Sequence, residues 1–221
     1  MTAQESRLDL ERRRRLGMVE AVWGEHKSVD QIVAILLSMQ TAGELALVTR
    51  VDAAKAAAVQ ERCPAVEVHG QAACLTLGEI PATRHAAQVA VLSGGTSDRR
   101  VAEEAALALS VHGVASESFL DVGVAGLHRL LDVLPDLTPM SVLIACAGME
   151  GALPTVLAGL APQPVIGVPV SVGYGVSAGG RAALDGMLAS CAPGLSVVNI
   201  DNGYGAAMAA LRILKGVDSQ D

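Results

Sequence analysis

The sequence predicts an α/β fold, with a doubly wound parallel sheet in three layers preceded by a small N-terminal α/β appendage. From about residue 85 onward, apolar strand-like stretches alternate five times with helical stretches, and the connections are short. Such alternation is typical of a parallel sheet with helices on both faces. The composition agrees, because 51% of the residues are hydrophobic but only 2% are aromatic. Small aliphatic side chains suit buried parallel strands.

Five strands are expected, each an apolar run that ends in glycine or polar residues. They span 88–95, 118–123, 141–148, 164–170 and 195–200. The stretches after them are helical in pattern, and the first opens on Ser-Asp and stops at glycine. They span 97–113, 124–134, 149–161, 177–191 and 205–216. We expect this regular part of the chain, residues 83–221, to form the parallel-sheet catalytic domain.

The first 82 residues lack this rhythm, and we expect residues 1–82 to form the appendage. Ser28 is placed to cap a helix that follows it. Strand-like stretches occur at 44–50 and 65–70. The basic run Glu11–Arg15 has two interpretations, a phosphate-binding patch or a solvated helix face beside acidic neighbours.

Net charge and cysteine spacing exclude several classes of protein. The formal charge of −7 argues against a nucleic-acid-binding surface. We find no apolar run that could span a membrane and no apolar core of a secretory signal. The four cysteines form no CxxC pair and match no zinc pattern. We therefore expect a cytoplasmic protein with reduced thiols and neither nucleic-acid nor membrane partners.

Every strand of the expected sheet ends in a polar or glycine-rich cluster. The clusters read SGGTSD, DVGVAG, CAGMEG, VPVSVGYG and NIDNGYG. Because ligands of such sheets bind outside the carboxyl ends of the strands, these clusters predict one large site.

The cluster at 93–98 follows a strand and opens a helix, so its backbone N–H groups and the helix dipole favour an anion. Ser93, Thr96 and Ser97 add hydroxyl donors. The alternative is an ordinary strand–helix turn. Asp98 would repel a phosphate, so it fits better as a dipole partner, a ribose-hydroxyl acceptor or a magnesium ligand.

Two further clusters carry candidate side chains. Glu150 follows a strand between glycines, where it would serve as a general base or simply as a first-turn helix residue. His128 and Arg129 lie one turn into a helix. His128 is either a site residue or a structural histidine, and Arg129 is either a phosphate contact or a solvated charge. Asn199 and its neighbours in the last cluster suit sugar hydroxyls or phosphates, and they also suit a tight turn.

The cysteines Cys146 and Cys191 differ in context. Cys146 lies within an apolar strand and is expected to be a small core residue. Cys191 lies at a helix C-terminus, where the dipole disfavours a thiolate, so position alone favours an inert thiol. A cationic substrate ring would reverse that argument.

Four strings taken in order resemble the purine-pathway aminoimidazole ribonucleotide carboxylase and mutase family. They are VLSGGTSD, VLIACAGMEGALPTVLAGL, PVIGVPVSVGYG and VVNIDNGYGAA. The segments SVGYG and IDNGYGA, the cysteine in MLASCAPG and the N-terminal appendage depart from that family. These departures resemble the LarB family, the pyridinium-3,5-biscarboxylic acid mononucleotide synthases of nickel-pincer cofactor biosynthesis, and the resemblance covers about 210 residues.

The resemblance implies a carboxylase and hydrolase that acts on nicotinic acid adenine dinucleotide. It implies carboxylation of the pyridinium ring at C5, with CO2 or bicarbonate as co-substrate, and cleavage of the diphosphate to release AMP. It also implies assistance by Mg²⁺ and assembly as a homo-octamer. The alternatives are a purine-pathway aminoimidazole ribonucleotide mutase and a non-catalytic nucleotide-binding protein. The order of the two steps, and discrimination from NAD, stay open.

The resemblance also implies roles for residues. Cys191 would add to the ring as a transient nucleophile, Glu150 would be the base, and Asp98 would orient a hydroxyl or help hold magnesium. Substrate contacts are expected from residues at the strand ends and the helices that follow. They are Ser93, Gly94, Thr96, Ser97, His128, Arg129, Gly148, Met149, Ser171, Tyr174, Asn199, Asp201 and Asn202.

Overall fold

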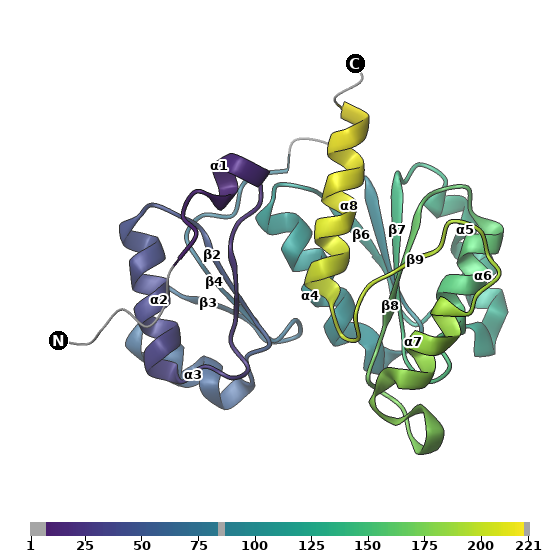
Figure 1. Cartoon of the computed structure of the whole chain (residues 1–221), viewed down its shortest axis with the longest axis horizontal. Helices are drawn as coiled ribbons and strands as arrows, with labels where there is room; N and C mark the ends of the chain where they lie inside the picture. Colours follow the sequence, from purple (N-terminus) through teal and green to yellow (C-terminus); the bar gives the residue numbers. More distant parts are fainter. Residues whose placement is uncertain (1–7, 84–86, 219–221) are drawn as a thin grey trace. The chain divides into compact units, whose positions relative to one another are not determined.

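The computed structural model describes residues 8–83 and 87–218 (Figure 1). The chain divides into two compact units, Met1–Ala82 and Thr83–Asp221. Each unit has its own sheet, and each is described by itself. No helix in the described ranges is long and apolar enough to cross a membrane.

The N-terminal unit is a small α/β sheet structure, as predicted. Its elements are α1 (Arg12–Leu16), β1 (Ala21–Trp23), α2 (Val29–Thr41), β2 (Ala46–Thr49), α3 (Ala53–Arg62), β3 (Glu67–His69) and β4 (Cys74–Leu77). The strand order is β1-β2-β4-β3. Strands β1 and β2 are parallel, whereas β4 runs antiparallel to both of its neighbours. The segment β1-α2-β2-α3 therefore contains two consecutive strand–helix units.

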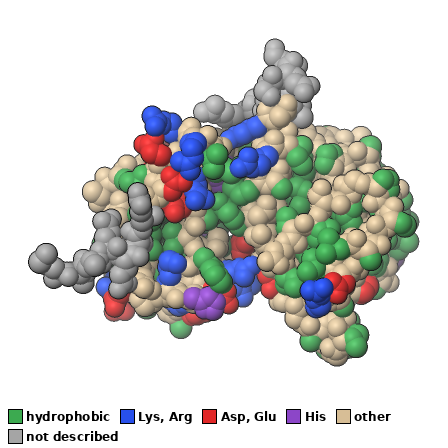
Figure 2. Space-filling view, in the orientation of Figure 1, with side chains coloured by type: hydrophobic (Ala, Val, Ile, Leu, Met, Phe, Trp, Pro, Cys, Tyr) green, Lys and Arg blue, Asp and Glu red, His purple; other side chains and the backbone are tan. Residues whose placement is uncertain are grey.

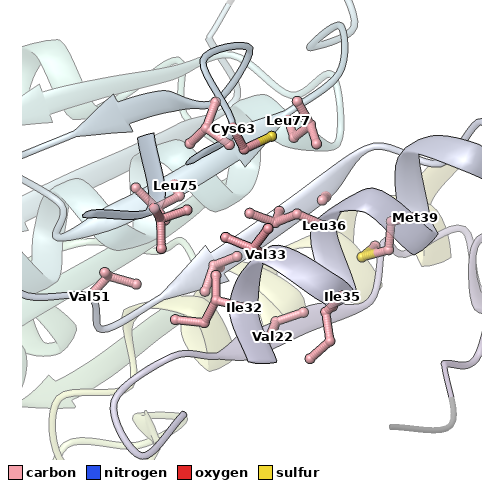
Figure 3. Close-up of a cluster of buried hydrophobic side chains, with 14 of the residues drawn as sticks. Val22, Ile32, Val33, Ile35, Leu36, Met39, Val51, Cys63, Leu75 and Leu77 are labelled. Atoms are coloured by element: carbon pink, nitrogen blue, oxygen red, sulfur yellow. The ribbon is translucent and has the colours of Figure 1, made fainter. Parts of the chain in front are cut away.

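The predicted cap at the start of α2 is present. The Ser28 side chain accepts a hydrogen bond from the Gln31 backbone N–H, and the Gln31 side chain accepts one from the Ser28 N–H. This capping box satisfies two N–H groups that the helix leaves unpaired. The apolar side of α2, with Ile32 and Leu36, lies in the core cluster of this unit (Figure 3). Cys63 belongs to the same cluster, so its thiol is a packing group.

The ion pairs of helix α1 favour one of the two interpretations of the basic run. Arg15 pairs with Asp9 at 2.6 Å, and Arg12 reaches the same carboxylate at 3.4 Å. Arg14 pairs with Glu11. Figure 2 accordingly shows basic and acidic side chains interspersed on this unit. The pattern favours a solvated helix face whose charges are locally compensated.

The C-terminal unit contains the predicted parallel sheet. Its strands are β5 (Val89–Ser93), β6 (Ser116–Phe119), β7 (Val142–Ala147), β8 (Val165–Pro169) and β9 (Ser196–Val197), in the order β6-β5-β7-β8-β9. All neighbouring pairs are parallel. Every residue of β5, β7 and β8 is buried, as expected for strands covered on both faces.

Helices cover both faces of this sheet (Figure 1). They are α4 (Arg99–Val111), α5 (Leu127–Leu137), α6 (Ala152–Leu160), α7 (Arg181–Leu188) and α8 (Gly203–Asp218). Helices α4 and α8 pack together on one face, and α6 and α7 pack together on the other. Gly203 permits the α4–α8 contact, because a Cβ there would lie 2.3 Å from the Val101 carbonyl oxygen. The doubly wound prediction is confirmed.

Several element boundaries differ from the sequence prediction. Strand β6 begins at Ser116 rather than 118, because its Ser-Glu-Ser segment lies at the sheet edge with polar residues partly exposed. Strand β9 has two residues rather than six, since the chain turns after it. The stretch expected as one helix over 177–191 is split into the 3-10 segment η3 (Gly175–Gly180) and α7. Elements β1, α3 and β4 were not predicted.

Candidate active site

The carboxyl ends of β5 and β7 form the topological switch point of the parallel sheet. From β5 the chain crosses to β6 on one side, and from β7 it continues through β8 and β9 on the other. Ligands of doubly wound sheets bind in the crevice at such a point. Residues 93–98 and 148–151 form the two loops there.

Asp98 joins these two loops. Its Oδ2 accepts a hydrogen bond from the Gly95 N–H at 2.8 Å, and its Oδ1 accepts one from the Gly148 N–H at 3.1 Å. Gly148 has no room for a side chain, because a Cβ would lie 2.2 Å from the Val172 carbonyl oxygen and 3.1 Å from Asp98 Oδ1. The glycine is therefore needed to bring the β7 loop onto the carboxylate.

The Asp98 carboxyl is 6% exposed, and burial raises its pKa above the ordinary value of 3.8. The two backbone N–H groups oppose this shift because they stabilise the carboxylate, while the charge of Asp201 adds to it. A carboxyl whose pKa is raised in this way gains and loses a proton nearer neutral pH than an exposed aspartate does. That property is typical of functional carboxyl groups.

Ser93 and the β6 loop are joined by two hydrogen bonds. The buried Ser93 hydroxyl oxygen accepts one from the Asp121 N–H at 3.1 Å, and the Ser93 carbonyl accepts one from the Val122 N–H at 2.9 Å. Asp121 has a left-handed backbone (φ 61°), and its side chain accepts a hydrogen bond from Arg129 at 2.6 Å. Arg129 therefore holds the shape of this loop.

The β8 and β9 ends are joined through Asp201. Its Oδ1 accepts a hydrogen bond from the Ser171 N–H at 2.8 Å, and its own N–H donates to the Pro169 carbonyl at 2.8 Å. The Met149 N–H donates to the Val172 carbonyl at 3.0 Å, which links the β7 and β8 loops. Met149 and Asp201 both have left-handed backbones (φ 55° and 54°). Strained residues of this kind cluster at functional sites.

The start of α8 is closed by side chains. Asn202 Oδ1 accepts a hydrogen bond from the Gly205 N–H at 2.8 Å, and Glu104 of α4 accepts one from the Tyr204 N–H at 2.9 Å. Asn199 Oδ1 accepts one from the Ile200 N–H at 2.8 Å. The sequence analysis did not single out Glu104. The available signal was a carboxylate on the otherwise small and apolar side of an amphipathic helix, where a charge needs a partner.

Other predicted site residues are exposed. Thr96 and Ser97 lie in the 3-10 turn before α4, and within the described residues no partner is found for their backbone N–H groups or hydroxyls. His128, Glu150 and Tyr174 are also exposed, and the Tyr174 side chain is 78% accessible. These groups are accessible to a ligand.

Cys191 lies apart from this edge. It is exposed and follows α7, which begins near the carboxyl edge and runs back for eight residues, about 12 Å. The next strand pairs Ser196 with Ile166, near the start of β8. Cys191 is therefore on the amino-edge side of the sheet within its own chain. The connectivity could have shown this, because a residue between a helix and the following parallel strand lies at that edge.

Cys146 is a core residue, as expected. It is fully buried in β7, and burial raises the pKa of its thiol, with the charges of Asp98, Glu104 and Asp201 adding to the effect. A thiol in this environment stays protonated and is a poor nucleophile.

A magnesium site built from this chain alone does not fit the residues present. Among residues 8–83 and 87–218, no group of three or more His, Cys, Asp or Glu side chains gathers as a metal would require. Both Asp98 oxygens already accept backbone hydrogen bonds, so neither is left with a free direction toward a metal within the described fold. Mg²⁺ often binds one or two carboxylates together with substrate phosphates, so the phosphates would have to supply most of the ligands.

The comparisons with known proteins match both units. Residues 2–79 match the family described as LarB/PurE-like N-terminal domain. Residues 88–220 match the family described as AIR carboxylase, where AIR is aminoimidazole ribonucleotide. This chain belongs to the LarB family, with an AIR carboxylase-like C-terminal domain. The family expected from the sequence is thereby confirmed.

Individual relatives agree with this assignment. An uncharacterized protein of Methanocaldococcus jannaschii is 37% identical over 217 residues, which is 95% of this chain and 84% of that protein. An N5-carboxyaminoimidazole ribonucleotide mutase of the same organism is 37% identical over 133 residues, 57% of this chain and 78% of its own. The mutase of that name from Mycobacterium leprae is 32% identical over 146 residues, 60% of this chain and 78% of its own. The chain is an enzyme of the carboxylase or mutase type.

Proposed function

We propose that this enzyme carboxylates the pyridinium ring of nicotinic acid adenine dinucleotide at C5 and cleaves its diphosphate to release AMP. The second product is pyridinium-3,5-biscarboxylic acid mononucleotide, for nickel-pincer cofactor synthesis, and the setting is the cytoplasm. Carbon dioxide, free or from bicarbonate, is the co-substrate. One observation carries the proposal: a single chain joins the LarB-type N-terminal domain to an AIR carboxylase domain.

The open start of α4 supports binding of a phosphorylated substrate. Thr96 and Ser97 present exposed hydroxyls and backbone N–H groups ahead of a 13-residue helix. N–H groups at a helix start, with the positive end of the dipole behind them, bind phosphate. Exposed His128 and Tyr174 follow β6 and β8, the strands on either side of the central β5–β7 pair, where the rest of a dinucleotide would extend.

The proposed ring chemistry needs a nucleophile, because a pyridinium ring is electron-poor and does not attack carbon dioxide. The Cys191 thiolate adds to C6, forming an S–C bond and moving an electron pair into the ring as an enamine. C5 then attacks the carbon of CO2 and forms the new C–C bond. A base removes the C5 proton, and departure of the thiolate with the S–C electron pair restores the aromatic ring.

We assign the base to Glu150 and a positioning role to Asp98. Glu150 is exposed beside the switch point, next to the left-handed Met149, so it is accessible to a bound ring. Asp98 is buried and bonded to two backbone N–H groups, which suits orientation of a sugar hydroxyl. Glu150→Gln should slow carboxylation by about 100-fold or more. An effect on dinucleotide affinity alone would make Glu150 a binding residue instead.

Cys191 has to come from a second copy of the chain to take part. Within one chain Cys191 lies at the amino edge of the sheet, whereas the switch point lies at the carboxyl edge. Its position between α7 and the following parallel strand requires this. The homo-octamer implied by family resemblance supplies such copies. Exposed apolar side chains of Val176 (96% accessible) and Leu188 (64%) offer surface that a neighbouring copy would bury.

The diphosphate is cleaved by water attack at phosphorus, with the P–O bond to the departing phosphate breaking and AMP leaving. Magnesium, when bound, neutralises charge on the diphosphate. Its ligands would come mainly from the substrate, with Asp201 as the nearby carboxylate that this chain offers beside Asp98. Thr96, Ser97 and the helix start behind them would orient the phosphates.

The test is product analysis by mass spectrometry with the dinucleotide, bicarbonate and Mg²⁺. Wild type should yield the biscarboxylated mononucleotide and AMP, and Cys191→Ser should lose carboxylation while remaining folded, because a hydroxyl is far less nucleophilic near neutral pH. Unchanged product from Cys191→Ser would contradict the covalent step. Binding of the dinucleotide by wild type without any product would identify a non-catalytic nucleotide-binding protein.

Co-expression of two inactive variants tests the composite site. Cys191→Ala retains Asp98, and Asp98→Asn retains Cys191. If each site combines Asp98 of one copy with Cys191 of another, randomly mixed assemblies should recover about a quarter of wild-type activity. Assemblies of either variant alone should stay inactive. No recovery in the mixture would mean that both residues must belong to the same chain.

A second candidate function is supported by the two mutase relatives, at 37% and 32% identity. A carboxyaminoimidazole ribonucleotide mutase needs no cysteine. Full activity of Cys191→Ala on aminoimidazole ribonucleotide would favour that function over the proposed one.

A further inference from the structure

We propose that Glu104 is a positioning residue for the reaction, because it fixes the segment that carries Asp201 against the helix whose start carries Asp98. It acts through the backbone of α8 rather than on the substrate. The proposal rests on the proposed function, and it adds to that function a residue from the interface between α4 and α8.

Helices α4 and α8 each begin beside a carboxylate of the candidate site. Asp98 directly precedes α4, and Asp201 lies two residues before α8. The two helices pack against each other on one face of the sheet (Figure 1). The relative position of the two carboxylates therefore depends on how the two helix starts are held together.

Glu104 supplies a hydrogen bond across this helix interface. It lies in the second turn of α4 and is 6% exposed. Its Oε1 accepts a hydrogen bond from the Tyr204 N–H, in the first turn of α8, at 2.9 Å. Burial of a carboxylate is costly unless it is hydrogen-bonded, and a bond from a backbone N–H to a carboxylate is stronger than one between neutral groups. The bond therefore fixes where α8 starts along α4.

A close backbone contact fixes the same point. Gly203 directly precedes Tyr204, and a Cβ on this glycine would lie 2.3 Å from the Val101 carbonyl oxygen and 3.0 Å from the Ala105 backbone nitrogen. The start of α8 thus lies against the α4 backbone with no side chain between them. The glycine permits the approach, and the Glu104 side chain defines its register.

Two hydrogen bonds carry this position into the site. The Asp201 N–H donates to the Pro169 carbonyl at 2.8 Å, and Asp201 Oδ1 accepts from the Ser171 N–H at 2.8 Å. Asp201 and Tyr204 are only three residues apart. A displacement of Tyr204 should therefore move Asp201 and release the Ser171 segment that follows β8.

Electrostatics places the three carboxylates near one point. Burial raises the pKa of the Cys146 thiol in β7, and the charges of Asp98, Glu104 and Asp201 add to that shift. Because Coulomb interactions weaken with distance, all three groups lie near the carboxyl half of this central strand. Glu104 is thus close to the site, while its oxygen is bonded to the α8 backbone. This combination suits positioning rather than proton transfer.

Steady-state kinetics of two variants of similar size test this role. Glu104→Met keeps the length of the side chain without an acceptor oxygen, and Glu104→Gln keeps one. In Glu104→Met, kcat should fall about tenfold and KM should stay within about a factor of two, because the phosphates still bind at α4 while the loops around the ring are displaced. Glu104→Gln should restore kcat to within about threefold of wild type. A wild-type kcat in Glu104→Met, or no rescue by Glu104→Gln, would overturn the proposal.

The matched control is the neighbouring glutamate of the same helix. Glu103 pairs with Arg99 at 3.0 Å, one turn earlier on α4, and makes no bond to α8 among the described residues. Glu103→Met should leave kcat and KM unchanged. An equal loss of kcat in Glu103→Met would show that any change on α4 has this effect, and would count against a specific role of Glu104.

Hydrogen exchange of the unliganded protein separates this proposal from the proposed reaction, because it needs no turnover. In Glu104→Met the Ser171 N–H should exchange about tenfold faster, together with the Tyr204 N–H, whereas Glu103→Met should match wild type. Faster exchange confined to Tyr204 would mean that the bond is structural only. Failure of wild type to form product would refute the proposed function without changing this result.

Gly203→Ala gives the same test by another route, including the case in which Glu104→Met does not fold. It retains Glu104, but its methyl group displaces the start of α8 from α4. The Ser171 N–H should again exchange faster than in wild type. Unchanged exchange of Ser171 in this variant would show that the α8 start does not control the loop after β8.

Discussion

Two helices begin at the carboxyl edge of the parallel sheet, and they differ in what binds their first N–H groups. At α8, Asn202 and Glu104 accept hydrogen bonds from Gly205 and Tyr204. Before α4, the Thr96 and Ser97 N–H groups have no partner within the described chain. Similar glycine-rich sequences thus give a closed helix start and an open one. The difference teaches that a glycine-rich turn identifies an anion site only when the fold leaves its N–H groups unpaired.

The comparison also separates the predicted site residues that form hydrogen bonds within the fold from those that are exposed to a ligand. Asp201 and Asn202 hold backbone together at the α8 side, whereas Thr96 and Ser97 remain available for a ligand. Asp98 belongs with the first group, since it is buried and ties two loops together at the switch point. Four predictions sharpen or break this division.

The largest effect is expected at Asp98. In Asp98→Asn the side-chain NH2 group would face a backbone N–H, so one of the hydrogen bonds to Gly95 and Gly148 is lost and the loops separate. We expect turnover to fall by about 100-fold or more. Steady-state kinetics measure this, with Asp136→Asn, an exposed carboxylate of α5, as the matched control. Turnover within a factor of two of wild type would show that the link between loops is dispensable.

The open start of α4 should govern substrate affinity. The double variant Thr96→Ala/Ser97→Ala should raise KM about tenfold with little change in kcat, because two ground-state hydrogen bonds to the substrate are lost. Asn202→Ala, at the closed helix start, should leave KM unchanged. The reverse pattern in the two variants would place the phosphate at α8 and break the comparison.

The closed start of α8 should govern stability. Asn202→Ala removes the side chain that accepts the Gly205 N–H, so the free energy of unfolding should fall by about 1 kcal/mol. Urea unfolding followed by circular dichroism measures the change. The substitution Thr96→Ala serves as the control and should cost less than half as much, since its side chain has no partner in the described fold.

The smallest effect concerns the pH dependence of stability. The pKa of the Asp98 carboxyl is raised above 3.8 by burial, so the native state binds this proton more tightly than the unfolded chain does. The contribution of Asp98 to unfolding free energy is therefore complete below 3.8 and declines as pH rises through the raised pKa. Asp98→Asn does not titrate. Wild type should lose stability relative to this variant with rising pH, and parallel urea-midpoint curves would contradict the assigned shift.

The layers of the fold were predictable because each buried strand carries a continuous apolar run that ends in glycine. The apolar run at residues 142–147 is enough by itself to predict a strand buried on both faces. Ser28, a residue type that favours N-caps, predicts the start of α2. The predicted start of strand β6 was two residues too late, because the polar residues at the start of this edge strand interrupt the apolar pattern. Strands β1 and β4 were missed because three or four residues are too few for a periodic signal.

The contacts of the candidate site were less predictable because they join distant positions. Asp98 and Gly148 are fifty residues apart, and Glu104 and Tyr204 a hundred, as their hydrogen bonds record. Residue type predicted that Asp201 and Asn202 belong to the edge. It did not distinguish a ligand contact from a bond that closes the fold, because the same oxygen atoms serve both purposes.

One thiol stands out from the other three by its surroundings. Cys63, Cys74 and Cys146 are buried, and Cys191 is exposed. Alkylating reagents should therefore modify the native enzyme at a single position, and peroxide or air should attack that position first. With Cys191 as the proposed nucleophile, a preparation stored without reductant would lose activity by sulfur oxidation long before its fold was damaged.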